Sequence, residues 1–354
     1  MSNQITFAVP GDFSALTGGY HYDRSLLHAL RKAGRNVVHL PLSEGFPFPS
    51  ADDMRTAIAR LAAVPDTHDL IIDGLAYGAL ATDALRQLQA PLVALVHHPL
   101  AHESGLPGVE VRRLHALERA NLAQAAHVIV PSPYIRQVLE RDYDVEAARI
   151  TVVRPGRPAF GQGVARAPHA GEPLILSVGL LHPRKGHDVL IAALAQVADI
   201  PWQAVIVGTP WQTGHDAELQ AQIDRAALGG RVRLLGRVGA KELATLYSQA
   251  HLFALATRFE GYGIVFDEAL LHGLPIVSTT AGAVPDTVPR AAGILVAPDD
   301  AAAFAQALRT LLEDNALHAA KAEAARSAGN ELPSWDDAAA AVGRVMEKVR
   351  EGRS

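Results

Sequence analysis

The chain has 354 residues, of which 49% are hydrophobic and 19% charged, so it is globular and long enough for two domains, each with its own core. A formal net charge of −5 gives no basic footprint for nucleic acid. The sequence contains no cysteine, which excludes disulfides, thiolate nucleophiles and cysteine-ligated zinc. No signal peptide is visible, and no apolar run has the length of a membrane span, so we expect a soluble, cytoplasmic protein.

The first half of the chain alternates apolar runs with segments whose apolar residues recur at helical spacing. These patterns predict strands at 5–9, 36–42, 69–75, 91–96, 127–132 and 150–153. They predict helices at 20–33, 52–63, 79–88, 109–124 and 133–141. Apolar strands that alternate with helices are typical of a parallel sheet covered on both faces, which binds its ligand beyond the carboxyl ends of the strands.

A glycine pair follows the first predicted strand. Gly18 and Gly19 lie in the predicted loop before the first helix, where glycine lets a ligand approach the backbone. The pair does not form a G-x-G-x-x-G pattern, so a dinucleotide site has weak support. A plain tight turn is the alternative.

Three histidines and a glutamate follow the strand at 91–96, in the sequence LVHHPLAHESG. A metal site is disfavoured, because Pro99 opposes the helix that would give the spacing of His98 and His102 a geometric meaning. Either His97 or His98 is expected to face a ligand at this strand end. A purely structural histidine pair is the alternative.

A domain boundary is predicted after residue 153, where the sequence RPGRP precedes a run rich in Gly, Ala, Pro and His. Such composition is typical of a linker between compact domains. We place an N-terminal domain at 1–160, a linker at 161–172, a second domain at 173–330 and a last helical segment at 331–354.

The second half repeats the alternation of strands and helices. Strands are predicted at 173–178, 202–207, 232–235, 252–256 and 293–296, and helices at 216–227, 241–250, 299–313, 315–328 and 335–349. A further helix is expected to begin beside Arg184 and Lys185. Two cations, backbone amides and a helix dipole directly after a strand together favour phosphate. A solvated pair of cations is the alternative.

The segment at 258–279, RFEGYGIVFDEALLHGLPIVST, predicts a loop, a short helix, a turn and a buried strand. Glu260 is expected on the loop and Glu268 about one turn into the helix. The backbone N–H groups of Gly261, Tyr262 and Gly263 would then meet an anion at the helix N-terminus. The two carboxylates can accept from sugar hydroxyls and ribose hydroxyls on either side of that anion, which describes a nucleotide sugar. A capped amphipathic helix with solvated acids is the alternative.

The two acids, the glycines, the Gly-x-Pro turn and the strand that follows resemble the signature of retaining glycosyltransferases of the GT-B fold, family 4 (group 1). The resemblance covers essentially the whole chain and is specific in the second half. It implies an α/β fold of two Rossmann-like domains that face each other across a cleft. It also implies a C-terminal helix that crosses back to the N-terminal domain.

The resemblance assigns roles to the acids and cations. It implies that Glu260 holds hydroxyls of the transferred sugar and that Glu268 binds the ribose. Lys185 and Arg184 stabilise the diphosphate, although Leu180 stands where the family often has an arginine. Arg184 resembles the family's Pro-Arg-Lys variant of this turn.

Other positions take roles from the same resemblance. His97 points at the donor sugar or the acceptor. The remaining residues implied at the donor are Gly261, Tyr262 and Gly263 at the phosphates, Gly18 and Gly19, Gly208 at a strand end, and Arg237 or Val238 at the base. The loop AGAVPD at 281–286 only partly matches a Gly-Gly-x-x-Glu-like loop of the family.

The implied reaction moves a hexose-type sugar from a nucleoside diphosphate sugar to a hydroxyl of a glycan, glycolipid or small molecule. Retention of the anomeric configuration is expected, without a metal or another cofactor, because cations and amides supply the positive potential that the leaving diphosphate needs. The alternatives are a catalytically degenerate nucleotide-sugar-binding protein of the same fold and a nucleotide-sugar epimerase. Arg112 and Arg113 usually indicate a solvated helix face, and a weak peripheral contact with the inner membrane face is the alternative. The nucleotide base, acceptor, linkage and oligomeric state are left open.

Overall fold

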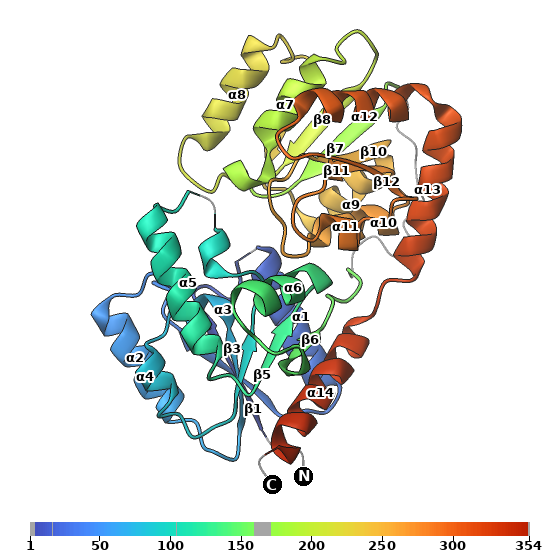
Figure 1. The fold of residues 1–354 in the computed structure, drawn as a ribbon. Helices are drawn as coiled ribbons and strands as arrows, with labels where there is room; N and C mark the ends of the chain where they lie inside the picture. The colour runs from blue at the N-terminus through green and yellow to red at the C-terminus, as the bar shows by residue number, and fades with distance from the viewer. Residues whose placement is uncertain (1–3, 16, 104, 159–170, 353–354) are drawn as a thin grey trace. The chain divides into compact units, whose positions relative to one another are not determined.

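The computed structural model describes residues 4–15, 17–103, 105–158 and 171–352. The chain forms two compact units (Figure 1). Met1–Gly156 and Pro333–Ser354 make up the first unit, and Arg157–Leu332 make up the second. The predicted linker at 161–172 lies, except for its last two residues, outside the described residues.

The first unit is built on a six-stranded sheet in the order β2-β1-β3-β4-β5-β6. Its strands are β1 (Ile5–Pro10), β2 (Val37–Leu42), β3 (Asp69–Asp73), β4 (Leu92–Leu95), β5 (His127–Val130) and β6 (Ile150–Val152). All neighbouring strands pair in parallel. The strand order reverses between β1 and β3, and open α/β sheets bind their ligands beyond the carboxyl ends at such a point.

The helices of the first unit are α1 (Gly18–Lys32), α2 (Ala51–Ala62), α3 (Gly74–Tyr77), α4 (Thr82–Leu85), α5 (Gly108–Leu122), α6 (Pro133–Asp142) and α14 (Trp335–Glu351), with short 3-10 helices η1 (Leu100–His102) and η2 (Ala147–Arg149). The prediction of a loop at Gly18 and Gly19 is wrong. Thr17 caps α1 by accepting a hydrogen bond from the backbone N–H of Tyr20, so both glycines fall in the first helical turn.

The prediction of a continuous helix at 79–88 is also wrong, because only residues 82–85 of that range are helical, as α4, and α3 lies before the range at 74–77. α3 begins directly after β3, so the strand predicted to reach residue 75 ends at Asp73. The Asn121 side-chain amide donates to the carbonyls of Tyr77 and Leu80, each at 2.8 Å. The two carbonyls, at the end of α3 and in the turn that follows it, are thus satisfied by a side chain outside the helices.

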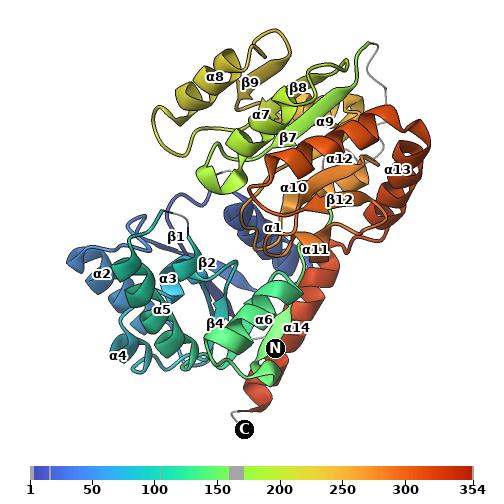
Figure 2. The same cartoon turned by 45° about the horizontal axis from the view of Figure 1, so that its top comes forward.

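The C-terminal helix α14 packs against α1 and β5 in the first unit (Figures 1 and 2). It begins with a capping box, in which the side chains of Ser334 and Asp337 each accept a hydrogen bond from the backbone N–H of the other residue. Its apolar face joins the core through Ala338, Ala339, Val342, Val345, Met346 and Val349. The guanidinium of Arg350 forms an ion pair with buried Asp69 at the start of β3.

The second unit holds a six-stranded parallel sheet in the order β12-β11-β10-β7-β8-β9. Its strands are β7 (Leu174–Val178), β8 (Gln203–Val207), β9 (Val232–Gly236), β10 (Leu252–Leu255), β11 (Ile276–Thr279) and β12 (Gly293–Val296). Its helices are α7 (His187–Ala195), α8 (His215–Arg225), α9 (Ala240–Gln249), α10 (Ile264–Leu271), α11 (Val284–Thr287), α12 (Ala301–Glu313) and α13 (Asn315–Asn330), and a 3-10 helix, η3 (Pro183–Lys185), precedes α7.

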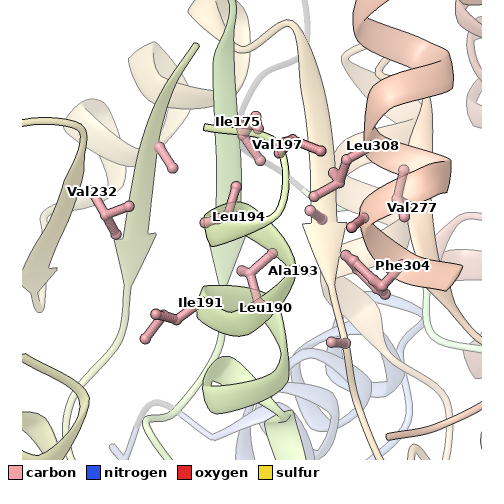
Figure 3. Close-up of a cluster of buried hydrophobic side chains, with 14 of the residues drawn as sticks. Ile175, Leu190, Ile191, Ala193, Leu194, Val197, Val232, Val277, Phe304 and Leu308 are labelled. Carbon is pink, nitrogen blue, oxygen red and sulfur yellow. The ribbon is translucent and has the colours of Figure 1, made fainter. Parts of the chain in front are cut away.

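Both faces of this sheet are buried. On one face α7 and α12 cover Ile175 and Val277 with Leu190, Leu194, Phe304 and Leu308 (Figure 3). On the other face Phe253 and Leu255 of β10 pack with Phe266 of α10 and Tyr247 of α9. Successive residues of β10 alternate between the two clusters, as strand geometry requires. The sheet is therefore a rigid base for the loops at its carboxyl edge.

Candidate functional site

The predicted cations lie on a turn between β7 and α7, residues 182–188, which we call the cationic turn. The His182 ring accepts a hydrogen bond from the backbone N–H of Arg184 at 3.0 Å. Gly186 has a left-handed φ of 65°, and a Cβ there would lie 1.9 Å from the carbonyl oxygen of Ala256. Only glycine allows this close approach, which presses the cationic turn against the end of β10.

Glu260 lies within hydrogen-bonding distance of Lys185, as the order of neighbouring strands β10 and β7 allows. Lys185 Nζ donates to Glu260 Oε1 at 2.6 Å, and Thr257 Oγ1 donates to the same oxygen at 3.1 Å. Arg184 Nη1 is 3.7 Å from Glu260 Oε2 and donates to the carbonyl of Phe259 at 2.8 Å. Glu260 is 4% exposed, so these groups form a compact, buried cluster.

The charges of this cluster are set by its geometry. Burial acts to raise the pKa of Glu260, but the nearby charges of Lys185 and Arg184 outweigh burial and lower that pKa. The carboxylate is therefore ionised at neutral pH. One carboxylate and two cations leave a net positive charge, which favours an anion at the carboxyl edge of the sheet.

The loop at 281–286, a partial match in the sequence, packs directly on Glu260. The backbone N–H of Ala283 donates to the Glu260 carbonyl at 2.9 Å. Gly282 has a φ of 58°, and a Cβ there would lie 2.3 Å from the same carbonyl oxygen. The glycine that this loop retains is the one that lets it approach Glu260.

The three residues before α10 form its N-terminal turn. Gly263 has a φ of 89°, and a Cβ there would lie 2.6 Å from the Phe266 ring. The Tyr262 hydroxyl donates to Asp267 Oδ2 at 2.8 Å, and Thr287 Oγ1 donates to the Tyr262 carbonyl at 2.7 Å. These contacts order the turn; that its amides, including that of Gly261, bind phosphate stays a prediction.

Glu268 is buried in α10, one turn beyond the first residue of the helix. Burial raises the pKa of Glu268 to about 7, a hydrogen bond from Tyr247 acts to lower it, and neighbouring Asp267 acts to raise it. The Tyr247 hydroxyl donates to Glu268 Oε2 at 2.7 Å. The Tyr247 ring also stacks on His272 with centroids 5.1 Å apart. This fixed carboxyl group is poised to accept from hydroxyls.

The other predicted donor contacts lie at strand ends of the same sheet. Gly208 follows β8, and a Cβ there would lie 1.8 Å from the Gly179 carbonyl oxygen. Its backbone N–H donates to the Gly236 carbonyl at 2.9 Å. Arg237 is exposed, and half-buried Val238 packs against the apolar core. The packing explains the glycine, and contact of these residues with a nucleotide stays a prediction.

A second cluster lies in the first unit, where His97 follows β4. His97 Nε2 is 2.9 Å from Asp23 Oδ1 of α1 and 3.5 Å from Asp73 Oδ2 at the end of β3. Gly19 in the first turn of α1 lies close to the His97 ring, because a Cβ at Gly19 would be 3.3 Å from His97 Cδ2. The Tyr22 ring meets the imidazole edge to face at 5.1 Å.

This cluster holds His97 in a strongly acidic environment. Desolvation acts to lower the pKa of His97, but Asp23 and then Asp73 outweigh it and raise that pKa. Burial and the charge of Asp23 raise the pKa of Asp73. Asp23 Oδ2 is buried and has no hydrogen-bond partner among the described residues. The neighbouring His98 instead faces Glu103, at 3.2 Å.

Asp23, Asp73, Tyr247 and Thr257 were not singled out from the sequence. Asp23 did leave a signal, because it continues the apolar series Leu26, Leu27 and Leu30 on one helix face. A carboxylate on such a face is buried, and buried carboxylates have partners. Within the described ranges, Asp23, Asp73 and His97 are also the one set whose ligand atoms, all within 4.8 Å, could hold a metal ion.

Comparison with known proteins identifies the family. Residues 14–158 match the family described as Glycosyltransferase Family 4. Residues 172–314 match the family described as Glycosyl transferases group 1. The chain belongs to the group 1 glycosyltransferases of family 4. It is 26% identical to the glycogen synthase of Mycobacterium tuberculosis, over 92% of this chain and 89% of that protein.

Other relatives of this glycosyltransferase differ in the reactions that their names describe. A D-inositol 3-phosphate glycosyltransferase of Streptomyces avermitilis is 31% identical, over 63% of this chain and 52% of that protein. The sucrose-phosphate synthase of Thermosynechococcus elongatus has a similar structure, with a TM-score of 0.83, 22% identity and coverage of 98% and 100%. Anabaena HepE, solved with UDP and glucose, is similar with a TM-score of 0.77 and 20% identity, over 97% of this chain and 100% of that chain.

The predicted α/β fold with two Rossmann-like domains is confirmed by these likenesses and by the two parallel sheets. Among the described residues, no helix combines the length and apolar character that crossing a membrane requires.

Proposed function

We propose that this glycosyltransferase moves a hexose-type sugar from a nucleoside diphosphate sugar to an acceptor hydroxyl, with retention of the anomeric configuration. The observation that carries the proposal is the buried cluster of Lys185, Arg184 and Glu260, with its net positive charge at the carboxyl edge of a parallel sheet. HepE, a structural relative, has been solved with UDP-glucose, which supports this donor class.

In the proposed reaction, the bond between the anomeric carbon and the phosphate oxygen breaks, and its electron pair passes to the diphosphate. The acceptor oxygen bonds to the anomeric carbon on the same face, and its proton passes to the leaving phosphate oxygen. Lys185, Arg184 and the amides before α10 stabilise the charge that develops on the diphosphate. No metal ion is required for this step.

The acids orient the donor before the bond breaks. Ionised Glu260 accepts hydrogen bonds from hydroxyls of the transferred sugar, and Glu268, held by Tyr247, accepts from the ribose. Fixing the sugar in this way removes much of the entropic cost of reaching the reactive geometry. His97 and its two aspartates supply further groups for hydroxyls of the sugar or of an acceptor glycan, glycolipid or small molecule.

The test combines binding with turnover. Thermal unfolding is followed with UDP, GDP, ADP and their glucose conjugates, with NAD as the control that lacks a sugar diphosphate of this type. One nucleoside diphosphate is expected to raise the Tm by mass action. Its sugar conjugate is then supplied with acceptors, and release of the nucleoside diphosphate is measured. Absence of any shift contradicts the proposal, and binding without turnover indicates a degenerate nucleotide-sugar-binding protein.

A further inference from the structure

Arg258 precedes Glu260 by two residues and links it to the cationic turn. Its backbone N–H donates to the Arg184 carbonyl at 2.7 Å. Its guanidinium makes a bidentate contact with Asp188 in the first turn of α7, Nη1 to Oδ1 at 2.9 Å and Nη2 to Oδ2 at 2.8 Å. Arg258 thus holds the backbone of Arg184, before Lys185, and the side chain of Asp188, after it.

The same guanidinium reaches two more groups. Arg258 Nη1 donates to the Pro183 carbonyl, and Nε donates to Asp299 Oδ1 at 2.7 Å. Asp299 has a left-handed φ of 63°, a conformation that costs a non-glycine residue energy. The three donor nitrogens of the fork therefore all have oxygen partners, on the cationic turn and on the segment before α12.

Neighbouring contacts reinforce this link. Thr257 Oγ1 lies 3.1 Å from the Arg184 carbonyl oxygen and 3.1 Å from Glu260 Oε1, so its one proton can serve either acceptor. The cationic turn and the segment at 257–260 therefore share hydrogen bonds at both backbone and side-chain level. A planar, rigid guanidinium suits such a joint, because its donors are fixed relative to one another.

We propose that Arg258 is a positioning residue, which fixes the cationic turn against the segment at 257–260 and so sets the place of Lys185 relative to Glu260. In this role Arg258 acts on the reaction through the groups that it holds. The inference rests on the proposed function, since Lys185 and Glu260 are the groups that it assigns to the diphosphate and the sugar. Misplacement of catalytic groups by about 1 Å costs about 10²-fold in rate.

The chain offers a matched control in Arg309. Arg309 also makes a bidentate ion pair, with Asp199 at 2.6 and 2.9 Å, and it also contacts a backbone carbonyl, that of Gln196. Its side chain is 27% exposed, against 30% for Arg258. Arg309 holds the C-terminal end of α7, whereas Arg258 holds the N-terminal end. A purely structural ion pair would affect both variants alike.

The first arm of the experiment follows backbone hydrogen exchange in the full chain. Arg258→Gln is expected to speed exchange in peptides that span 182–190, and Arg309→Gln is expected to speed exchange at 194–200 only. Unchanged exchange at 182–190 in Arg258→Gln overturns the inference. This arm needs no ligand, so it decides the ordering role even if the proposed function fails.

The second arm measures kcat, the donor KM and the affinity for the nucleoside diphosphate. Arg258→Gln is expected to lower kcat/KM by about 10–10²-fold, with a loss of Tm similar to that of Arg309→Gln. Arg258→Lys keeps the charge without the fork and is not expected to restore the rate. Asp188→Asn should lower kcat/KM. The double variant Arg258→Gln with Asp188→Asn should lose no more kcat/KM than the single variant with the larger loss. Equal kinetic losses in Arg258→Gln and Arg309→Gln overturn the inference, whereas a wild-type chain that binds no nucleoside diphosphate contradicts only the proposed function.

Discussion

The ion pair between Lys185 and Glu260 allows the catalytic role of the lysine to be separated from its structural role. Lys185→Ala removes the 2.6 Å charged hydrogen bond from a carboxylate that is 4% exposed. Thr257 and Arg184 remain as partners, so the loss is that of one charged hydrogen bond, about 2 kcal/mol. For a unit of this size that corresponds to a fall in Tm of about 4–8 °C.

The effect on turnover has a different origin. Loss of one preorganised positive group at the leaving diphosphate costs about 10²–10³-fold in kcat. Adding Glu260→Gln to Lys185→Ala removes the buried charge that has lost its nearest cation. The double variant is therefore expected to regain much of the Tm while its turnover stays low. Steady-state release of the nucleoside diphosphate and differential scanning fluorimetry measure the two quantities on the same samples.

A matched lysine supplies the control. Lys321 Nζ donates to the backbone carbonyls of Gly293 and Arg290, at 2.9 and 3.1 Å, and it lies on α13. Lys321→Ala is expected to lower the Tm and to leave kcat unchanged. Wild-type turnover in Lys185→Ala would refute the leaving-group role. Turnover that recovers together with the Tm in the double variant would show that the lysine only compensates a buried charge.

Three further predictions test other parts of the two clusters. Glu268→Gln should weaken nucleoside diphosphate binding in calorimetry. Burial raises the folded-state pKa of Glu268 to about 7, so the stability that this group contributes is present below its unfolded pKa and is lost as the pH rises to about 7. Glu268→Gln should remove this pH dependence of the free energy of unfolding. Asp23→Asn should lower the raised pKa of His97. The stability that His97 adds below its unfolded pKa should then be lost at lower pH than in wild type. An unchanged NMR titration of the imidazole would contradict this coupling. Gly282→Ala should lower both Tm and donor affinity, since its Cβ would lie 2.3 Å from a backbone oxygen, whereas Gly230→Ala, with nothing within 4 Å, should change neither.

Local patterns were enough to predict most of the fold. The apolar runs match the strands of both sheets to within about two residues, because the strands of a parallel sheet that is covered on both faces are largely apolar. The positions of Glu260 on a loop and Glu268 one turn into a helix followed from the glycines and the helical spacing around them. Those features act over a few residues, which is why the sequence alone carries them.

What could not be predicted depends on contacts between distant residues. The carbonyls of Tyr77 and Leu80, at the break between α3 and α4, are bonded by Asn121, more than forty residues away. The pairing of His97 with Asp23 crosses 74 residues, and that of Arg258 with Asp188 crosses 70. Gly18 and Gly19 read as a loop, because a glycine pair is a poor helix former, yet Thr17 caps a helix that includes both.

The contact between Lys185 and Glu260 has a consequence for donor binding. Lys185 is 2.6 Å from Glu260, and in the proposed reaction the lysine serves the diphosphate while the carboxylate serves the sugar. Donor binding must therefore replace the contact between Lys185 and Glu260 by two others, one between Lys185 and the diphosphate and one between Glu260 and the sugar. The sugar alone offers Glu260 no cation to replace Lys185. A diphosphate that draws Lys185 away leaves an ionised carboxylate whose free acceptor sites the sugar hydroxyls then satisfy. The binding of the two halves of the donor is coupled in this way, so the free sugar should bind far more weakly without the nucleoside diphosphate than with it.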